Sequence, residues 1–138
     1  MEQNTKQQLE KIVAANGDLR ERIQKESWTI SYNRSADMIS MGGNFPKSTF
    51  YFSLKDSRVM VRIDKNYRIY GFAIENAKAF IKENPQEGVL LSFIVYPIRS
   101  FAIKLPLYFL AYQTTKGVET MKSIFSISDY VAGRAAYA

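Results

Sequence analysis

The sequence predicts an α+β fold, in which an antiparallel β-meander packs against N-terminal, central and C-terminal helices. Two patterns lead to this prediction. Apolar residues recur at helical spacing over residues 5–26, and they alternate with polar residues in several short segments of residues 28–75. The chain has 138 residues, of which 46% are hydrophobic, so one core is feasible. We therefore expect a single domain over residues 1–138.

The N-terminal segment has the apolar spacing of an amphipathic helix, with positions three and four residues apart on one face. These positions are Leu9, Ile12, Val13, Leu19 and Ile23. Gly17 is a weak point in this pattern, and Asp18 with Glu21 three residues later forms a capping-box pattern. We expect either one helix that is weak at Gly17 or two collinear pieces.

The middle of the chain contains five segments with strand-like alternation, separated by short polar turns. These segments are residues 28–32, 38–41, 50–54, 59–63 and 69–75. The alternation also predicts which side chains share a face. The expected inward set is Phe50, Phe52, Val59, Val61 and Ile63, and the opposite set is Tyr51, Met60 and Arg62.

A short helix is expected from Asn76 to Asn84, with Asn76 as its N-cap and Pro85 as its end. Residues 86–88 then read as a loop. A C-terminal helix is expected over residues 118–136, where Val118, Met121, Ile124 and Phe125 share one face.

Residues 89–112 leave two interpretations open. The apolar runs 89–96 and 98–105 are rich in β-branched residues and are separated by Pro97, which is typical of buried strands. A helix after Pro106 fits the following residues equally well. Two prolines and two charges, Arg99 and Lys104, interrupt this stretch, so we expect no transmembrane span. We expect it to be part of the core, with membrane-surface contact or an oligomer interface as alternatives.

The composition excludes several classes of enzyme, because the chain contains no Cys and no His. It therefore has no thiolate nucleophile, no Cys-type zinc site and no imidazole base. We expect no catalytic residue, no cofactor and no metal ligand. The remaining enzymatic alternative is a carboxylate or tyrosine site, for which Asp37, Asp64 and Glu75 would have to converge. The absence of Cys and the polar start of the chain are compatible with a cytoplasmic protein.

The positive charge is concentrated in the middle of the chain. The net charge is +6, and residues 28–85 carry nine basic and five acidic residues, a net of +4. Basic and aromatic side chains mixed in a sheet are typical of nucleic-acid-binding surfaces. The candidate nucleic-acid-binding residues are Tyr51, Arg58, Arg62, Lys65, Arg68 and Tyr70. The alternative interpretation is a solvated sheet face, on which Lys and Arg discourage edge pairing.

Two stretches of the middle segment have a recognisable pattern. In residues 30–40 a turn and Asp37 join two expected strands, and in residues 61–77 an Asp64 turn leads into an expected strand with the ending Gly71-Phe-Ala-Ile-Glu75. These stretches resemble a small bacterial family of unknown function, number 2283 in the domain-of-unknown-function series. The resemblance covers residues 28–84. It leaves residues 1–27 as a helical extension and residues 85–138 as an apolar one.

The resemblance implies an antiparallel meander with a helix packed on it and no enzyme activity. Some relatives are thought to pair with toxin-like proteins, which implies an interaction role. Together with the composition, it leads to the hypothesis of a non-catalytic module that binds a protein partner or a second copy of itself. Nucleic-acid binding and a carboxylate or tyrosine enzyme are the alternatives.

Overall fold

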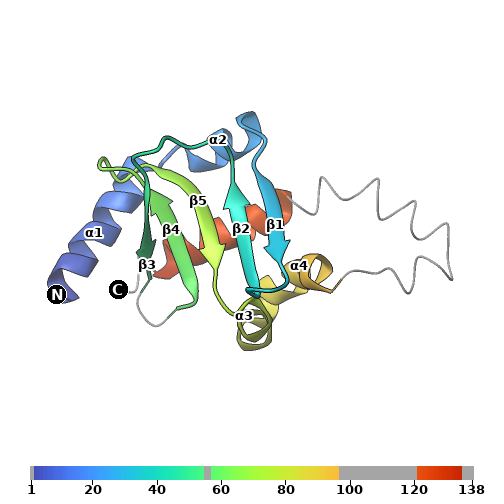
Figure 1. The fold of residues 1–138 in the computed structure, drawn as a ribbon. Helices are drawn as coiled ribbons and strands as arrows, with labels where there is room; N and C mark the ends of the chain where they lie inside the picture. Colours follow the sequence, from blue (N-terminus) through green and yellow to red (C-terminus); the bar gives the residue numbers. More distant parts are fainter. Residues whose placement is uncertain (1, 55–56, 97–120, 135–138) are drawn as a thin grey trace, which may run out of the picture.

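The computed structural model describes residues 2–54, 57–96 and 121–134, and it confirms the α+β class. A five-stranded antiparallel sheet has helices packed against one face (Figure 1). Residues 121–134 form a further helix, which we call the C-terminal helix. The remaining elements are α1 (Glu2–Ala15), α2 (Leu19–Lys25), β1 (Thr29–Asn33), β2 (Met38–Gly42), β3 (Phe50–Ser53), β4 (Val59–Ile63), β5 (Ile69–Ile74), α3 (Ala77–Glu83) and α4 (Pro85–Val95).

The strands follow the order β1-β2-β5-β4-β3, so the meander is interrupted once. The connection over residues 43–49 carries the chain around one end of the sheet to its far edge (Figure 1). Strands β3, β4 and β5 then return hairpin by hairpin, and β5 pairs with β2. As a result β5 is the central strand, while β1 and β3 are the two edges.

Two glycines allow β2 and β5 to lie side by side. Gly42 is directly opposite Gly71 in the antiparallel register. A Cβ at Gly71 would collide with the carbonyl oxygen of Met41, and one at Gly42 would lie 2.8 Å from the carbonyl oxygen of Tyr70. The close approach of the two backbones therefore excludes a side chain at either position.

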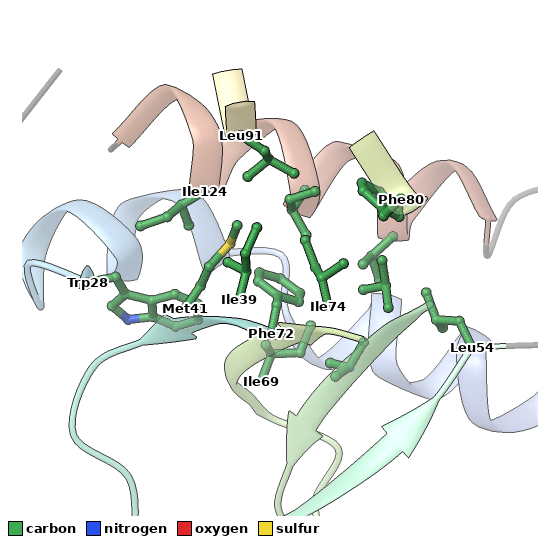
Figure 2. Close-up of a cluster of buried hydrophobic side chains, with 14 of the residues drawn as sticks. Trp28, Ile39, Met41, Leu54, Ile69, Phe72, Ile74, Phe80, Leu91 and Ile124 are labelled. Carbon is green, nitrogen blue, oxygen red and sulfur yellow. The ribbon is translucent and has the colours of Figure 1, made fainter. Parts of the chain in front are cut away.

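The core lies between one face of the sheet and the helices, of which the C-terminal helix crosses behind the strands (Figures 1 and 2). The prediction that Val59, Val61 and Ile63 of β4 point into the core is confirmed, because each of them is at most 1% exposed. Phe50 is paired with Ile63 and shares its face, yet it remains 52% exposed because β3 is an edge strand. The C-terminal helix contributes Ile124 and Ile127, which are fully buried.

The N-terminal helical segment is divided into α1 and α2 by residues 16–18. Asp18 occupies the N-cap position of α2, but its side chain makes no capping hydrogen bond. The capping-box prediction was therefore wrong. The Asp18 carboxylate instead forms ion pairs with Arg22 and Arg68, 3.4 and 3.2 Å away.

Asn76 occupies the predicted N-cap position of α3, but the capping hydrogen bond expected from its side chain is not formed. Asn76 precedes α3 with a φ of 48°. Asp37 in the β1–β2 turn takes this role, because its backbone oxygen accepts the N–H of Ala77 and its carboxylate accepts that of Lys78. A residue 40 positions away in the sequence thus caps α3, which no local pattern could reveal.

The loop predicted at residues 86–88 was wrong, since Pro85–Val95 forms α4. For the start of the apolar stretch, which the sequence left open between strand and helix, the structure has a helix that ends at Val95. Pro85 begins this helix rather than only ending α3, as its ring favours the first helical turn. Leu91 and Val95, one helical turn apart, are buried in the core. The expectations for residues 98–112 and Val118 lie outside the described residues. No helix in the described ranges has both the length and the apolar character needed to cross a bilayer.

We predict that Gly71→Ala lowers the free energy of unfolding by about 1–3 kcal/mol, because the added methyl group forces β2 and β5 apart. Denaturant unfolding monitored by circular dichroism measures the change. The matched control is Gly133→Ala in the C-terminal helix, where a Cβ would meet nothing within 4 Å. This control should raise stability by up to about 1 kcal/mol. Equal effects of the two substitutions would contradict the assigned β2–β5 register.

Candidate functional site

The six candidate nucleic-acid-binding residues do not form one surface. Tyr51 and Arg62 lie directly opposite each other on β3 and β4, and Lys65 is exposed in the β4–β5 turn. The side chains of Arg58, Arg68 and Tyr70 are engaged by acidic residues of the chain itself. The structure therefore places Tyr51 and Arg62 together at the exposed sheet edge, whereas Arg68 and Tyr70 meet in a separate network around Asp64.

This pair belongs to a group that we call the β3 aromatic cluster. In it, Phe45 and Tyr51 contact Arg62, and Phe50 extends the group to the other face of β3. The guanidinium carbon of Arg62 lies 3.8 Å from the ring centre of Phe45 and 4.9 Å from that of Tyr51. Its Nε also donates a hydrogen bond of 2.7 Å to Thr49 Oγ1. Cation–π contact on two sides and this hydrogen bond hold the Arg62 side chain in place.

The rings of the cluster remain accessible to a partner. Phe45 is 49% exposed, Tyr51 43% and Phe50 52%. Phe45 and Tyr51 contact Arg62, whereas Phe50 has the opposite strand parity and lies on the core-facing side at the sheet edge. The sequence analysis did not identify Phe45, because this residue lies in a loop outside the alternating strand segments. The available signal was a large apolar residue within the polar loop between Gly43 and Thr49.

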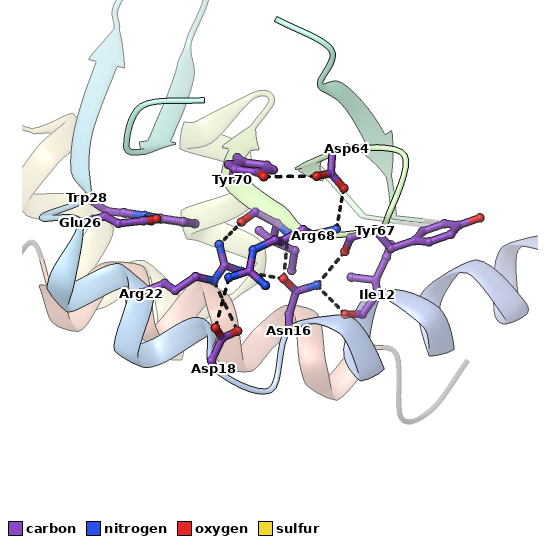
Figure 3. A network of polar contacts seen from close by, with 11 residues as sticks. Ile12, Asn16, Asp18, Arg22, Glu26, Trp28, Asp64, Tyr67, Arg68 and Tyr70 are labelled. Carbon is purple, nitrogen blue, oxygen red and sulfur yellow. Dashed lines mark hydrogen bonds and ion pairs between the residues drawn. The ribbon is translucent and has the colours of Figure 1, made fainter. Parts of the chain in front are cut away.

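Arg68 and Tyr70 belong instead to a partly buried polar network that joins the α1–α2 junction to β5 (Figure 3). Asn16 is its centre. Its amide nitrogen donates to the carbonyl oxygens of Ile12 and Tyr67, at 2.6 and 2.7 Å. Its amide oxygen accepts the N–H of Ile69 at 2.8 Å and the Arg22 Nη2 at 2.7 Å. All four hydrogen-bonding positions of this side chain are used.

Arg22 extends the same network into the core. The residue is 7% exposed, and its Nη1 donates to the carbonyl oxygen of Ile69 at 2.8 Å. Desolvation alone would raise the pKa of the Asp18 carboxyl, but the guanidinium groups of Arg22 and Arg68 hold that pKa below its ordinary value. Because the hydrogen-bonding positions of Asn16 are all used and Arg22 is buried, we assign this network a structural role.

Asp64 anchors the β4–β5 turn. Its carboxylate accepts the backbone N–H of Asn66 at 2.8 Å and of Arg68 at 3.1 Å, and the Tyr70 hydroxyl at 3.2 Å. Desolvation opposes these hydrogen bonds, yet they keep the pKa of Asp64 below its ordinary value. Desolvation and the bond to Asp64 raise the pKa of the Tyr70 hydroxyl. The Asp64 carboxylate and the Tyr70 hydroxyl therefore stabilise the β4–β5 turn.

The carboxylates proposed for an enzymatic site are not gathered at one point. Asp37 follows β1 and holds the Tyr32 hydroxyl at 2.8 Å, whereas Asp64 lies at the other end of the sheet. Glu75 is exposed at the end of β5. Within the described residues, no group of three acidic residues is arranged to hold a metal ion.

Comparisons with protein-family models, with curated proteins and with solved structures found no match to this chain. The resemblance of residues 28–84 to the family of unknown function therefore remains a prediction. The physical character of the exposed surfaces is what supports a functional proposal.

We expect Asn16→Ala to lower the free energy of unfolding by about 2–4 kcal/mol, because it leaves the partly buried N–H of Ile69 and carbonyl of Tyr67 without partners. Urea titration followed by tryptophan fluorescence gives this value. Asn44→Ala, at an exposed loop position, is the control and should change it by less than about 0.5 kcal/mol. A similar loss in both variants would show that the Asn16 bonds are not stabilising.

We also expect stability to fall on acidification. The folded-state pKa values of Asp18 and Asp64 lie below the ordinary value of 3.8, so these carboxyls contribute stability above pH 3.8 that is lost as the pH falls through their folded pKa values. Asp64→Asn should reduce the difference in unfolding free energy between pH 6 and pH 3. The part of this difference that Asp18 contributes should remain. An unchanged difference in this variant would contradict the assigned role of Asp64.

Proposed function

We propose that the protein is a non-catalytic binding module that pairs with a second copy of itself through the edge strand β3. The observation that carries this proposal is the exposure of large aromatic rings on both faces of an edge strand. Phe50 is 52% and Tyr51 43% exposed, and among the residues that the structure describes β3 has a neighbouring strand on one side only. Exposed edges of this kind are templates for pairing with another chain.

The composition of this edge favours association. Residues 45–54 contain three phenylalanines and one tyrosine but only one charged residue, Lys47. Natural edge strands usually carry several charges or an inward-pointing charge that prevents such pairing. Two copies can therefore approach along β3 although each molecule carries a net charge of +6.

The geometry of a two-fold pairing limits the register. When two β3 strands pair in antiparallel fashion, the two-fold axis is perpendicular to the sheet. Each residue must then face a residue of the second copy whose side chain lies on the same face of the sheet. Centring the axis at Tyr51 satisfies this condition. Tyr51 then faces its own copy, and the exposed Phe50 faces Phe52 of the second copy. Cross-strand aromatic pairs contribute roughly 0.2–1 kcal/mol each.

The fixed position of Tyr51 supports the proposal further. Arg62 already contacts the rings of Tyr51 and Phe45, so less side-chain freedom is lost when a partner covers them. Because β3 has only four residues, the interface is small, and we expect a weak dimer.

Salt distinguishes self-association from nucleic-acid binding at the same cluster. Two positively charged copies repel each other, so added salt should strengthen dimerisation by screening. Nucleic-acid affinity would fall steeply with salt, because counterions are no longer released as favourably.

We predict that sedimentation velocity detects a concentration-dependent dimer of the full chain, which is stronger at 500 mM than at 50 mM NaCl. Phe50→Lys should weaken it by at least about tenfold, because it places a charge in the pairing edge. The control is Val89→Lys on α4, where Val89 is 63% exposed. A monomer at millimolar concentration would overturn the proposal. Tight binding of a DNA or RNA oligonucleotide by a monomer, lost at high salt, would favour nucleic acid instead.

A further inference from the structure

The guanidinium of Arg62 is held in place from three sides. The ring centres of Phe45 and Tyr51 lie 3.8 and 4.9 Å from its central carbon atom. Its Nε donates to Thr49 Oγ1, and this hydroxyl in turn donates to the carbonyl oxygen of Pro46 at 3.0 Å. These contacts fix the side chain through its two flat faces and its Nε.

The two Nη atoms of Arg62 are available to a ligand. Among the described residues, neither has a hydrogen-bond or ion-pair partner, and every buried side-chain nitrogen or oxygen there has one, so both Nη atoms reach solvent. The nearest acid along the chain, Asp64, is already held by the backbone N–H groups of Asn66 and Arg68. Carboxylates and phosphates are the usual partners of such a guanidinium edge.

Self-association through β3 would bring two of these groups to one face of the sheet, and the inference rests on that proposed function. Arg62 lies directly opposite Tyr51 across the β3–β4 pair. A two-fold dimer centred at Tyr51 therefore has one row of Arg62, Tyr51, Tyr51 of the second copy and Arg62 of the second copy. This row lies on the face opposite to the described helices, because Val61 and Ile63 point into the core (Figure 1).

The spacing of this row suits an extended anion. Neighbouring strands are about 4.8 Å apart, so three steps place the backbones of the two Arg62 residues about 14 Å apart. The two like charges lie on either side of the axis, each beside the ring of its own Tyr51. Residues 38–54 contain no Asp or Glu, so neither copy of this segment neutralises them.

We propose that the dimer binds a polyvalent phosphate, that is, a chain of two or more phosphate groups, between its two Arg62 side chains. The anion replaces the repulsion of the two guanidinium groups by charge-assisted hydrogen bonds on both sides. Because it binds both copies at once, it stabilises the dimer by mass action. A single phosphate group spans less of the distance, so the effect should rise with the length of the phosphate chain.

The test is sedimentation velocity of the full chain at one ionic strength and without divalent cations. NaCl alone is compared with mixtures that contain sodium orthophosphate, diphosphate or triphosphate. We expect triphosphate to lower the dissociation constant of the dimer at least about fivefold relative to NaCl, and orthophosphate to lower it less. Isothermal titration calorimetry should give one triphosphate per two chains. Adenosine triphosphate, compared with the inorganic chain, shows whether a nucleotide or a free phosphate chain is the better ligand.

The outcomes separate this inference from the proposed function. A dimer in NaCl that triphosphate does not strengthen, or a stoichiometry of one triphosphate per chain, would overturn the bridging site and leave self-association intact. A chain that stays monomeric in every salt would overturn both. A monomer in NaCl that becomes a dimer with triphosphate would support the site.

Two variants assign the effect to Arg62. Because Arg62 also contacts Phe45 and Tyr51, the quantity compared is the ratio of the dissociation constants with and without triphosphate in the same variant. In Arg62→Gln this ratio should lie within about twofold of one, and calorimetry should detect no triphosphate binding.

The matched control is Arg20→Gln on α2. Arg20 also stacks on a ring, 4.7 Å from the centre of Phe125, and its removal changes the net charge by the same amount. This variant should keep the ratio and the stoichiometry of the original chain. An equal loss in both variants would show that triphosphate acts only on the net charge, and the inference would fail.

Discussion

The backbone around the start of β5 is held by three parts of the chain at once, and the rest of the fold is arranged around it. Strands β2 and β4 pair with its two sides, while Asn16 and Arg22 bind the backbone of residues 67 and 69. The close contact of Gly71 with β2 completes this arrangement. Because these bonds are partly or fully buried, losing any one leaves a polar backbone group without water. The helices α1 and α2 are therefore positioned by hydrogen bonding as well as by apolar packing.

The central place of β5 has consequences for the surface. Because β5 lies beside β2, strand β3 is displaced to the outer edge, and its aromatic residues stay exposed. Residues that are close in sequence, such as Arg58 and Arg62, lie at opposite ends of β4 and belong to different surroundings. One lies beside Glu83, and the other supports Phe45 and Tyr51. The exposed aromatic edge thus follows from the strand order.

The sequence was informative where the pattern is local. All five strand segments and the inward set of β4 followed from alternation, because side chains on a strand point to opposite faces in turn. The loop expected at residues 86–88 was wrong, and the following residues stayed undecided, since a continuous apolar run has no periodicity to separate a buried helix from a buried strand. The candidate site was predicted only in part. Tyr51 and Arg62 were predicted to share one face of the sheet, and they lie opposite each other on β3 and β4. Phe45, in contrast, reaches Arg62 from a loop whose path is not encoded by alternation.

The sequence by itself determined the α+β class, the positions of the strands and the absence of thiol and imidazole chemistry, since these depend on composition and on short-range periodicity. Only the tertiary structure decided which strand became central, which acid caps α3 and which arginines are engaged by carboxylates. Asp37 at α3, Asn16 at β5 and Tyr130 beside Ser57 all join residues far apart in the chain. Such contacts form because buried polar groups must find partners wherever the packed chain brings them together.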